Sequence, residues 1–174
     1  MNVAQIRKYD IANGEGIRTS IFVSGCTHHC PNCFNGEYQD FSYGKPWTDR
    51  ETREVISDLK DPQVAGLTLL GGEPMQNLEL TQIIAAIRRE VDKPIWIYSG
   101  YTFEQILADP AKNTLLSQCQ VLVDGLFVEA KKDLTLAFRG SSNQRVIDIP
   151  KSLQAGHAVL YHLDGGQAAG PVNH

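Results

Sequence analysis

The sequence has no apolar run of the length that a membrane span requires. Nowhere in the 174 residues do apolar side chains approach the roughly 18 consecutive positions typical of a transmembrane helix. Residues 1–8 include polar and charged side chains, so they lack the apolar stretch of a secretory signal peptide. From these absences we expect a cytoplasmic protein with no membrane partner.

An excess of positive charge is also missing. Lysine and arginine number 16 against 20 aspartate and glutamate residues, which gives a formal net charge of −4. Proteins that bind nucleic acids usually carry a basic patch or a basic net charge. The composition therefore gives no reason to expect a nucleic-acid partner.

Cysteine is scarce and unevenly distributed. Of the four cysteines, Cys26, Cys30 and Cys33 lie within eight residues, whereas Cys119 stands alone. A secreted disulfide framework usually spreads its cysteines along the chain. In a reducing compartment, thiols gathered on one short segment more often hold a metal.

Apolar segments of strand length alternate with segments of helical periodicity. Strands are predicted at 20–23, 66–70, 94–98 and 120–123, with a weaker one at 145–149. Helices are predicted after capping boxes at Thr48 and Thr102, and along the apolar face between Leu80 and Val91. The alternation predicts an α/β fold with mainly parallel strands. Four or five such units are too few to close an eight-stranded barrel, so we expect an open, partial (β/α) barrel.

The length of the chain fits one domain. We expect this domain to span 1–150 and to be followed by a C-terminal extension, 151–174. The last ten residues are rich in glycine and alanine and have almost no apolar surface to bury. The end of the extension is therefore expected to be disordered.

The segment 26–33, called the cysteine loop below, has the spacing C-x3-C-x2-C and follows the first of these predicted strands. Three thiolates on one short loop can ligate a four-iron cluster and leave one iron open, whereas a cluster that only transfers electrons normally takes four cysteines. The open iron could be chelated by the amino and carboxylate groups of a methionine moiety. An electron from the reduced cluster would then break the adjacent sulfonium carbon–sulfur bond and leave a 5′-deoxyadenosyl radical.

Two other interpretations of the cysteine loop stay open. One is a zinc knuckle, in which His28, His29 or Cys119 would be the fourth ligand. The other is a redox disulfide between Cys30 and Cys33, which would leave Cys26 without a role. We expect both histidines to be solvated loop residues rather than ligands.

A glycine-rich turn, Gly71-Gly72-Glu73-Pro74, closes the strand predicted at 66–70. Paired glycines let a backbone approach a ligand closely, and Pro74 is suited to open the following helix. Ligands of parallel α/β sheets bind beyond the carboxyl ends of the strands. The turn and the cysteine loop are therefore expected to open on the same side of the molecule.

The cysteine spacing, the aromatic Phe34 directly after it and the Gly-Gly-Glu-Pro turn together resemble the radical S-adenosylmethionine superfamily. The implied ligands of a [4Fe–4S] cluster are Cys26, Cys30 and Cys33. By the same resemblance, the backbone of 71–74 receives the amino group of S-adenosylmethionine. Asn32, Cys33 and Phe34 would lie against that molecule, with Phe34 near the adenine. No catalytic residue beyond the cluster ligands is implied.

The segment Asn13-Gly14-Glu15-Gly16-Ile17-Arg18 is similar to the N-G-P-G-x-R or D-G-P-G-I-R segment of glycyl-radical-enzyme activases, with Glu15 in place of the usual proline. Within that group, the chain resembles the anaerobic ribonucleoside-triphosphate reductase activating proteins over roughly residues 1–149. The matching segments are 22–26, 96–101, 121–125 and 139–145. Without the resemblance, Arg18 is expected at the surface, and the later segments are expected to be core strand or turn.

This resemblance implies an activase that reductively cleaves S-adenosylmethionine at the cluster. The radical formed would take a hydrogen atom from a glycine of anaerobic (class III) ribonucleoside-triphosphate reductase and leave a glycyl radical there. The electron would come from an external one-electron donor, flavodoxin-like or similar.

Two alternative functions remain. A small radical enzyme acting on a free metabolite, of the 7-carboxy-7-deazaguanine synthase type, should have a pocket lined for a small substrate. An activase should instead present an open mouth to a protein. The other alternative is a zinc-stabilised binding module without catalysis, which would contain zinc instead of iron and sulfide.

Overall fold

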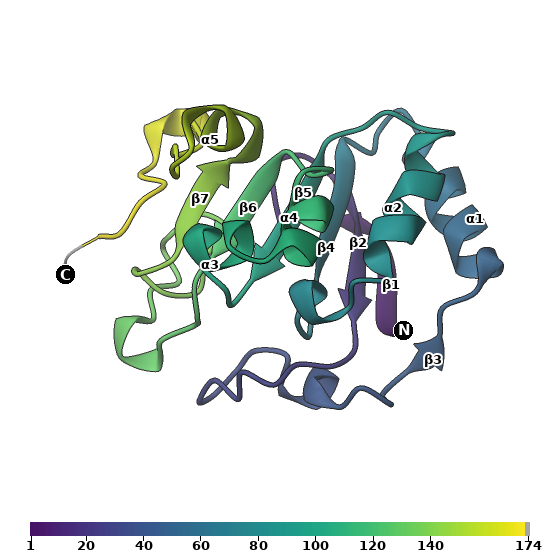
Figure 1. Ribbon diagram of the computed structural model, residues 1–174, viewed down its shortest axis with the longest axis horizontal. Helices are drawn as coiled ribbons and strands as arrows, with labels where there is room; N and C mark the ends of the chain where they lie inside the picture. The colour runs from purple at the N-terminus through teal and green to yellow at the C-terminus, as the bar shows by residue number, and fades with distance from the viewer. Residues whose placement is uncertain (173–174) are drawn as a thin grey trace.

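The structure, a computed structural model, describes residues 1–172. One mixed sheet runs through these residues in the order β3-β1-β2-β4-β5-β6-β7 (Figure 1). The strands are β1 (Asn2–Asp10), β2 (Arg18–Val23), β3 (Lys45–Pro46), β4 (Gly66–Gly71), β5 (Ile95–Ser99), β6 (Val121–Asp124) and β7 (Arg145–Asp148). The predicted α/β class is confirmed. The sheet is open, because its end strands β3 and β7 do not pair with each other.

The four central strands, β2, β4, β5 and β6, are parallel neighbours, as the sequence predicted. Their carboxyl ends meet at one edge of the sheet, where Val23 pairs with Gly71 and Ser99 pairs with Asp124. The segments that follow these strands, including the cysteine loop and the glycine-rich turn, all leave from this edge. The fold therefore brings the predicted site segments together.

Four helices cover one face of the sheet. They are α1 (Asp49–Leu59), α2 (Leu80–Arg88), α3 (Phe103–Leu107) and α4 (Pro110–Leu116). Because side chains alternate along a strand, Ile21, Leu69 and Ile97 all point towards this layer and are fully buried in one apolar cluster with it. Figure 1 shows α2 and α4 lying across the central strands. Within residues 1–172, no helix combines the length and the apolar character needed to cross a membrane.

Two helix starts agree with the sequence, and one does not. Capping boxes form at Thr48 ahead of α1 and at Thr102 ahead of α3. Pro74 was expected to open the next helix, but it begins only the 3-10 turn η2 (Pro74–Gln76), and α2 starts at Leu80. The turn ends at Asn77, whose φ of −122° and ψ of 62° are not helical and whose side chain donates a hydrogen bond back to the Glu73 carbonyl oxygen (3.0 Å).

Two strands, β1 and β7, run against the central four, whereas the short strand β3 runs in the same direction as they do. β1 is antiparallel to both β2 and β3, and β7 is antiparallel to β6. A parallel connection usually needs a helical crossover. The segment between β6 and β7 contains only the 3-10 turn η3 (Glu129–Lys131). The alternation of strands and helices in the sequence therefore did not predict these orientations.

The end of the chain covers part of the face opposite the helices, and the rest of that face, at Phe22, Leu70 and Tyr98, lines a cavity described below. After β7, the chain forms α5 (Ile149–Ala155) and returns across this face. Leu163 and Ala169 are buried there against Trp96, in a second apolar cluster. The backbone N–H of Val146 in β7 donates to the Ala169 carbonyl oxygen (2.7 Å).

The described part of the end that was expected to be disordered, residues 165–172, has packing partners. The buried guanidinium of Arg139 donates hydrogen bonds to the carbonyl oxygens of Ala168 and Gly170. The segment has little apolar surface, as its composition indicates, but its backbone carbonyl oxygens pair with the Arg139 guanidinium. Residues 173–174 lie outside the described part of the chain, and the boundary at residue 150 stays a prediction.

Candidate functional site

The cysteine loop is shaped by backbone hydrogen bonds. The N–H of Cys26 donates to the Gln39 carbonyl oxygen (3.0 Å), and the N–H of Cys33 donates to the Cys30 carbonyl oxygen (3.2 Å). All three thiols of the loop are half-buried. The loop therefore presents three partly accessible sulfur atoms from one short stretch of chain.

The glycine-rich turn lies directly against the start of the cysteine loop. The N–H of Gly72 donates to the Val23 carbonyl oxygen (2.7 Å), and the N–H of Glu73 donates to the Gly25 carbonyl oxygen (2.8 Å). A Cβ atom on Gly72 would stand 2.5 Å from that Gly25 oxygen, and Gly71 has a φ of +105° that favours glycine. The paired glycines are thus required by the approach of the two segments to each other.

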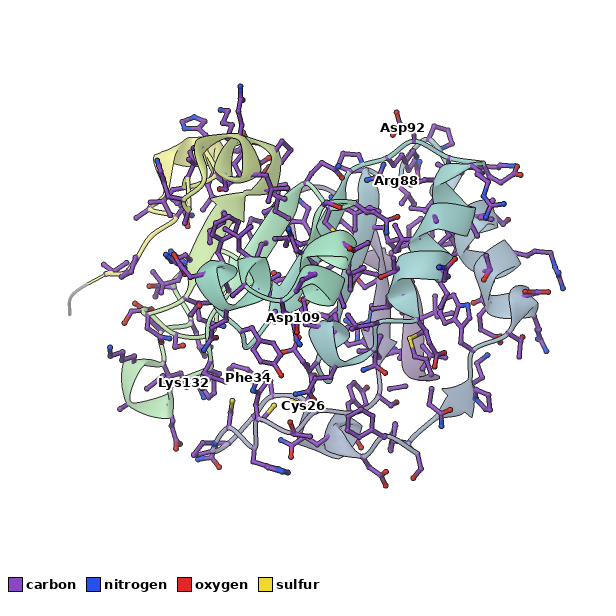
Figure 2. All side chains as sticks on the ribbon, in the orientation of Figure 1. Cys26, Phe34, Arg88, Asp92, Asp109 and Lys132 are labelled. Atoms are coloured by element: carbon purple, nitrogen blue, oxygen red, sulfur yellow. The ribbon has the colours of Figure 1, made fainter. Side chains whose placement is uncertain are left out.

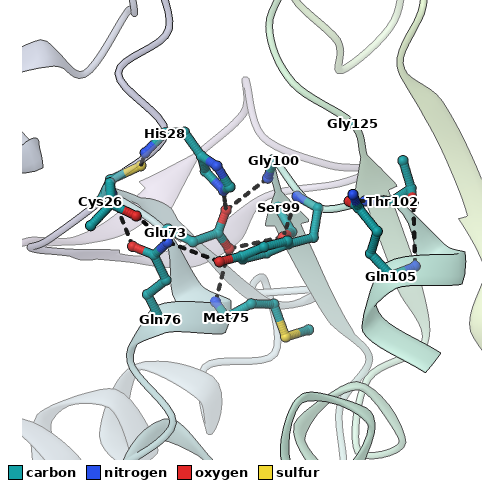
Figure 3. A network of polar contacts seen from close by, with 12 residues as sticks. Cys26, His28, Glu73, Met75, Gln76, Ser99, Gly100, Thr102, Gln105 and Gly125 are labelled. Carbon is teal, nitrogen blue, oxygen red and sulfur yellow. Dashed lines mark hydrogen bonds and ion pairs between the residues drawn. The ribbon is translucent and has the colours of Figure 1, made fainter. Parts of the chain in front are cut away.

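The side chain of Glu73 connects three segments of the site (Figure 3). Its carboxylate is only 1% exposed, and burial of a carboxylate is costly unless donors surround it. The donors here are Met75 N–H (2.8 Å), Ser99 Oγ (2.8 Å), Gly100 N–H (2.7 Å) and His28 Nε2 (2.8 Å). Glu73 therefore joins the ends of β4 and β5 to the cysteine loop.

A cavity of about 630 Å³ opens between these segments, a volume suited to a ligand of nucleotide size. The predicted site residues that line it are Cys26, Cys30, Cys33, Phe34, Gly71, Gly72 and Glu73. Asn32 and Pro74 do not line it. Asn32 donates a hydrogen bond to Glu129, and Pro74 is buried at the start of η2. Ser99, Gly100 and Gly125, which line the cavity at the ends of β5 and β6, were not nominated from the sequence.

One wall of the cavity continues onto exposed apolar side chains. Phe34 is 57% exposed, and its ring centre lies 4.9 Å from that of Phe127. Figure 2 shows Cys26 and Phe34 at this edge, and the Lys132 ammonium lies 5.4 Å from the centre of the Phe34 ring. Leu134, which also lines the cavity, is 73% exposed. The cavity therefore opens to the protein surface on this side.

The three loop cysteines fit a cluster with three protein ligands. Burial raises the pKa of Cys26 to about 11 and also raises the pKa of Cys30, so without a metal these thiols keep their protons. Bound metal favours the thiolate form and releases those protons. Thiolates are soft donors of the kind that hold iron–sulfur clusters.

The candidates for a zinc knuckle do not come together. Among the described residues, no group of three or more histidine, cysteine, aspartate or glutamate side chains is arranged to hold one metal ion, and this includes the three loop cysteines, which in a cluster would each bind a different iron. Cys119 is 1% exposed in the core, where its thiol lies 3.6 Å from the Leu115 carbonyl oxygen. His28 is bonded to Glu73, and His29 Nδ1 lies 3.3 Å from Gln39 Oε1. This arrangement gives no support to a four-ligand zinc site.

Two side chains differ from their predicted surroundings. His28 was expected to be solvated but is bonded to a buried carboxylate. Arg18 was expected at the surface but is 2% exposed, and burial lowers its pKa to about 10. Its guanidinium donates to Thr68 Oγ1 (2.8 Å) and to the carbonyl oxygens of Leu67 (2.9 Å) and Pro94 (3.0 Å). The sequence predicted that the cysteine loop and the glycine-rich turn open on the same side, and this could have indicated that His28 reaches Glu73. No local pattern in the sequence marks Arg18 as buried.

The later segments singled out in the sequence have structural roles. The Asp124 carboxylate accepts hydrogen bonds from the N–H of Phe103 (2.8 Å) and from Arg145 Nε (3.0 Å). The Gln144 side chain donates to the Gly125 carbonyl oxygen (3.0 Å). These contacts hold the ends of β6 and β7 beside the cavity.

Comparison with known proteins identifies the same region. A family model described as a 4Fe-4S single cluster domain matches residues 12–147, which include the cysteine loop and the glycine-rich turn. An anaerobic ribonucleoside-triphosphate reductase-activating protein of Pasteurella multocida is 39% identical over 150 residues, covering 83% of this chain and 95% of the relative. The protein of the same name from Escherichia coli K12 is 40% identical over 152 residues, covering 84% and 97%.

The similarity extends beyond bacteria. The activating protein of Enterobacteria phage T4 is 34% identical over 150 residues, covering 84% of this chain and 93% of the relative. In each case the match spans nearly the whole relative. This chain therefore belongs to the family of anaerobic ribonucleoside-triphosphate reductase-activating proteins and contains a 4Fe-4S single cluster domain.

Proposed function

We propose that this protein reductively cleaves S-adenosylmethionine at a [4Fe–4S] cluster and generates a glycyl radical on an anaerobic ribonucleoside-triphosphate reductase. The observation that carries the proposal is the shared cavity, whose wall contains all three loop cysteines and the glycine-rich turn. Cys26, Cys30 and Cys33 would hold the cluster and leave one iron for the substrate.

Held by the three cysteines, a reduced cluster would supply the one electron needed to split S-adenosylmethionine into methionine and a 5′-deoxyadenosyl radical, which would become 5′-deoxyadenosine by taking a hydrogen atom from a glycine of the partner. The residues of the chain bind and orient the substrate. The backbone of 71–74 would receive the methionine amino group beside the cysteine loop. The exposed face of Phe34 would pack against the adenine.

The opening of the cavity favours a protein substrate over a free metabolite. Phe34 and Leu134 line the cavity and are largely exposed, so this wall has no lid among the described residues. Radical chemistry has to be shielded from water and side reactions. A docked reductase could supply that cover, whereas a free metabolite would leave the wall open. The reductase as partner and an external one-electron donor are both parts of this proposal.

Anaerobic reconstitution with iron and sulfide tests the first half of the proposal. The expected product is a brown protein that releases 5′-deoxyadenosine from S-adenosylmethionine when a reductant is added. The Cys30→Ala variant should form neither the cluster nor 5′-deoxyadenosine. A protein that takes up zinc, or one that holds iron and sulfide without releasing 5′-deoxyadenosine, would contradict the proposed chemistry.

A further inference from the structure

His28 is the one side chain of the cysteine loop that reaches the buried carboxylate of the glycine-rich turn. Its Nε2 donates to Glu73 Oε2 at 2.8 Å, as Figure 3 shows. The other donors to Glu73 come from the turn itself and from the end of β5. The His28 hydrogen bond is therefore the side-chain link from the loop that carries the cysteines to the turn itself, beside the bonds of Thr27 to Gln76, two residues after the turn.

The neighbouring contacts leave His28 in a defined place. Its ring packs edge-on against Tyr101, with 4.7 Å between ring centres. Gly100 makes room for it, because a Cβ atom there would stand 2.6 Å from His28 Cδ2. The backbone beside it is also tied down, since the N–H of Thr27 donates to Gln76 Oε1 (2.9 Å). These contacts fix Thr27 and His28, which lie between Cys26 and Cys30 in the cysteine loop.

His28 also contacts the sulfur atom of one of the proposed cluster ligands. The backbone N–H of His28 donates to Cys26 Sγ (3.4 Å), so the position of His28 sets the direction of that donor. Hydrogen bonds to cluster sulfurs, and partners that orient metal ligands, influence the affinity and the potential of metal sites. A shift of His28 would therefore reach Cys26 directly and the facing turn through Glu73.

We infer that His28 is a positioning residue that fixes the cysteine loop against the glycine-rich turn through Glu73. It does so with a hydrogen bond, and the packing of its ring alone is insufficient. The inference rests on the proposed function for the identity of the cluster. It adds that the spacing between the middle of the cysteine loop and the S-adenosylmethionine-facing turn depends on this side chain, in addition to the backbone bonds at Gly72 and Glu73.

Four variants separate the possible causes. His28→Ala removes the donor and the ring, His28→Phe keeps a ring without the donor, and His28→Gln keeps an amide donor without the ring. His29→Ala is the matched control, because His29 lies next to it in the loop but is exposed and contacts Gln39 instead. Each reconstituted protein is challenged with an iron chelator, and the rate of iron loss is measured without S-adenosylmethionine or reductase.

We expect iron loss about tenfold faster in His28→Ala and His28→Phe, the scale typical of lost outer-shell partners, and near wild-type rates in His28→Gln and His29→Ala. The concentration of S-adenosylmethionine that perturbs the electron paramagnetic resonance spectrum of the reduced cluster should rise in the same two variants. Thermal melting of the iron-free proteins checks that they fold. If His28→Ala does not fold, the iron-loss rate of His28→Phe tests the inference in its place.

Wild-type rates in His28→Phe, or fast iron loss in His28→Gln, would overturn the inference, because the hydrogen bond would then not be the cause. Equal effects in His29→Ala would overturn it too, because any change in the loop would then suffice. Failure of the proposed function has a different signature. In that case the wild-type protein itself would bind no iron and sulfide, or would bind them and release no 5′-deoxyadenosine.

Discussion

Backbone atoms of Gly25 and Tyr38 limit how closely the two halves of the site can lie. Gly72 faces the Gly25 carbonyl oxygen, and a Cβ atom at position 72 would be 2.5 Å from it. That oxygen belongs to the backbone, so it cannot turn aside as a flexible side chain could. The turn and the cysteine loop would have to separate to admit a methyl group.

Gly72→Ala should therefore destabilise the iron-free protein by about 1–3 kcal/mol, the usual cost of overpacking, and should lower the iron bound after reconstitution. Gly36→Ala is the matched control, because Gly36 lies near the same loop and a Cβ atom there meets nothing within 4 Å. Chemical denaturation and iron analysis measure both effects. Equal stability and iron content in the two variants would show that the close approach is not required.

The four cysteines should divide into two chemical classes. Burial raises the pKa of Cys119 to about 12, and its thiol belongs to the core behind the helices. Cys119→Ala should retain iron and sulfide and lose only about 1 kcal/mol of stability, a typical cost for a core substitution. Cys26→Ala and Cys33→Ala should fail to assemble the cluster. Loss of the cluster in Cys119→Ala alone would reverse the assignment.

At the scale of elements, the sequence predicted the central strands and their common edge because each strand is a short apolar run that ends in glycine or a polar residue. β1 escaped prediction, since an outer strand that carries Arg7 and Lys8 has no continuous apolar run. The site divides in the same way. Spacing indicated the cysteines and the glycine-rich turn, whereas the link from His28 to Glu73 depends on a contact between residues 45 positions apart.

The C-terminal extension behaves as a structural element in spite of its composition. Residues 168–170 supply acceptors to the buried Arg139 guanidinium, and Ala169 joins the second apolar cluster. Deletion of 165–174 should cost about 2 kcal/mol, because the buried guanidinium loses the two acceptors at Ala168 and Gly170 and keeps only the Gln144 carbonyl oxygen. For a chain of this length, the melting temperature should fall by roughly 5 °C.

A second variant tests whether the loss of stability on deletion comes from the Arg139 hydrogen bonds or from a general loss of contacts. In an Arg139→Met background, the same deletion should cost clearly less, because no guanidinium then loses its acceptors. Differential scanning calorimetry on the four proteins gives the comparison. An unchanged melting temperature on deletion, or an equal loss in both backgrounds, would be evidence against this role of the extension.

At the scale of the whole molecule, an open sheet gathers four strand ends around one cavity and leaves one wall of it exposed. The chain belongs to a family of activating proteins and contains a 4Fe-4S domain, and the proposed function places its cluster at that edge. Among residues 1–172, Phe34 and Leu134 leave this wall uncovered. Completion of the site by a docked partner is therefore the central claim of the proposed function.

The most direct measurement is electron paramagnetic resonance on the reductase itself. The reconstituted protein is mixed anaerobically with the class III reductase of its own organism, a reductant and S-adenosylmethionine. We predict a glycine-centred doublet on the reductase, which is absent when Cys26, Cys30 or Cys33 is replaced by alanine. If 5′-deoxyadenosine forms without that doublet, and a purine-like metabolite stimulates turnover instead, the account is contradicted and the free-metabolite alternative takes its place.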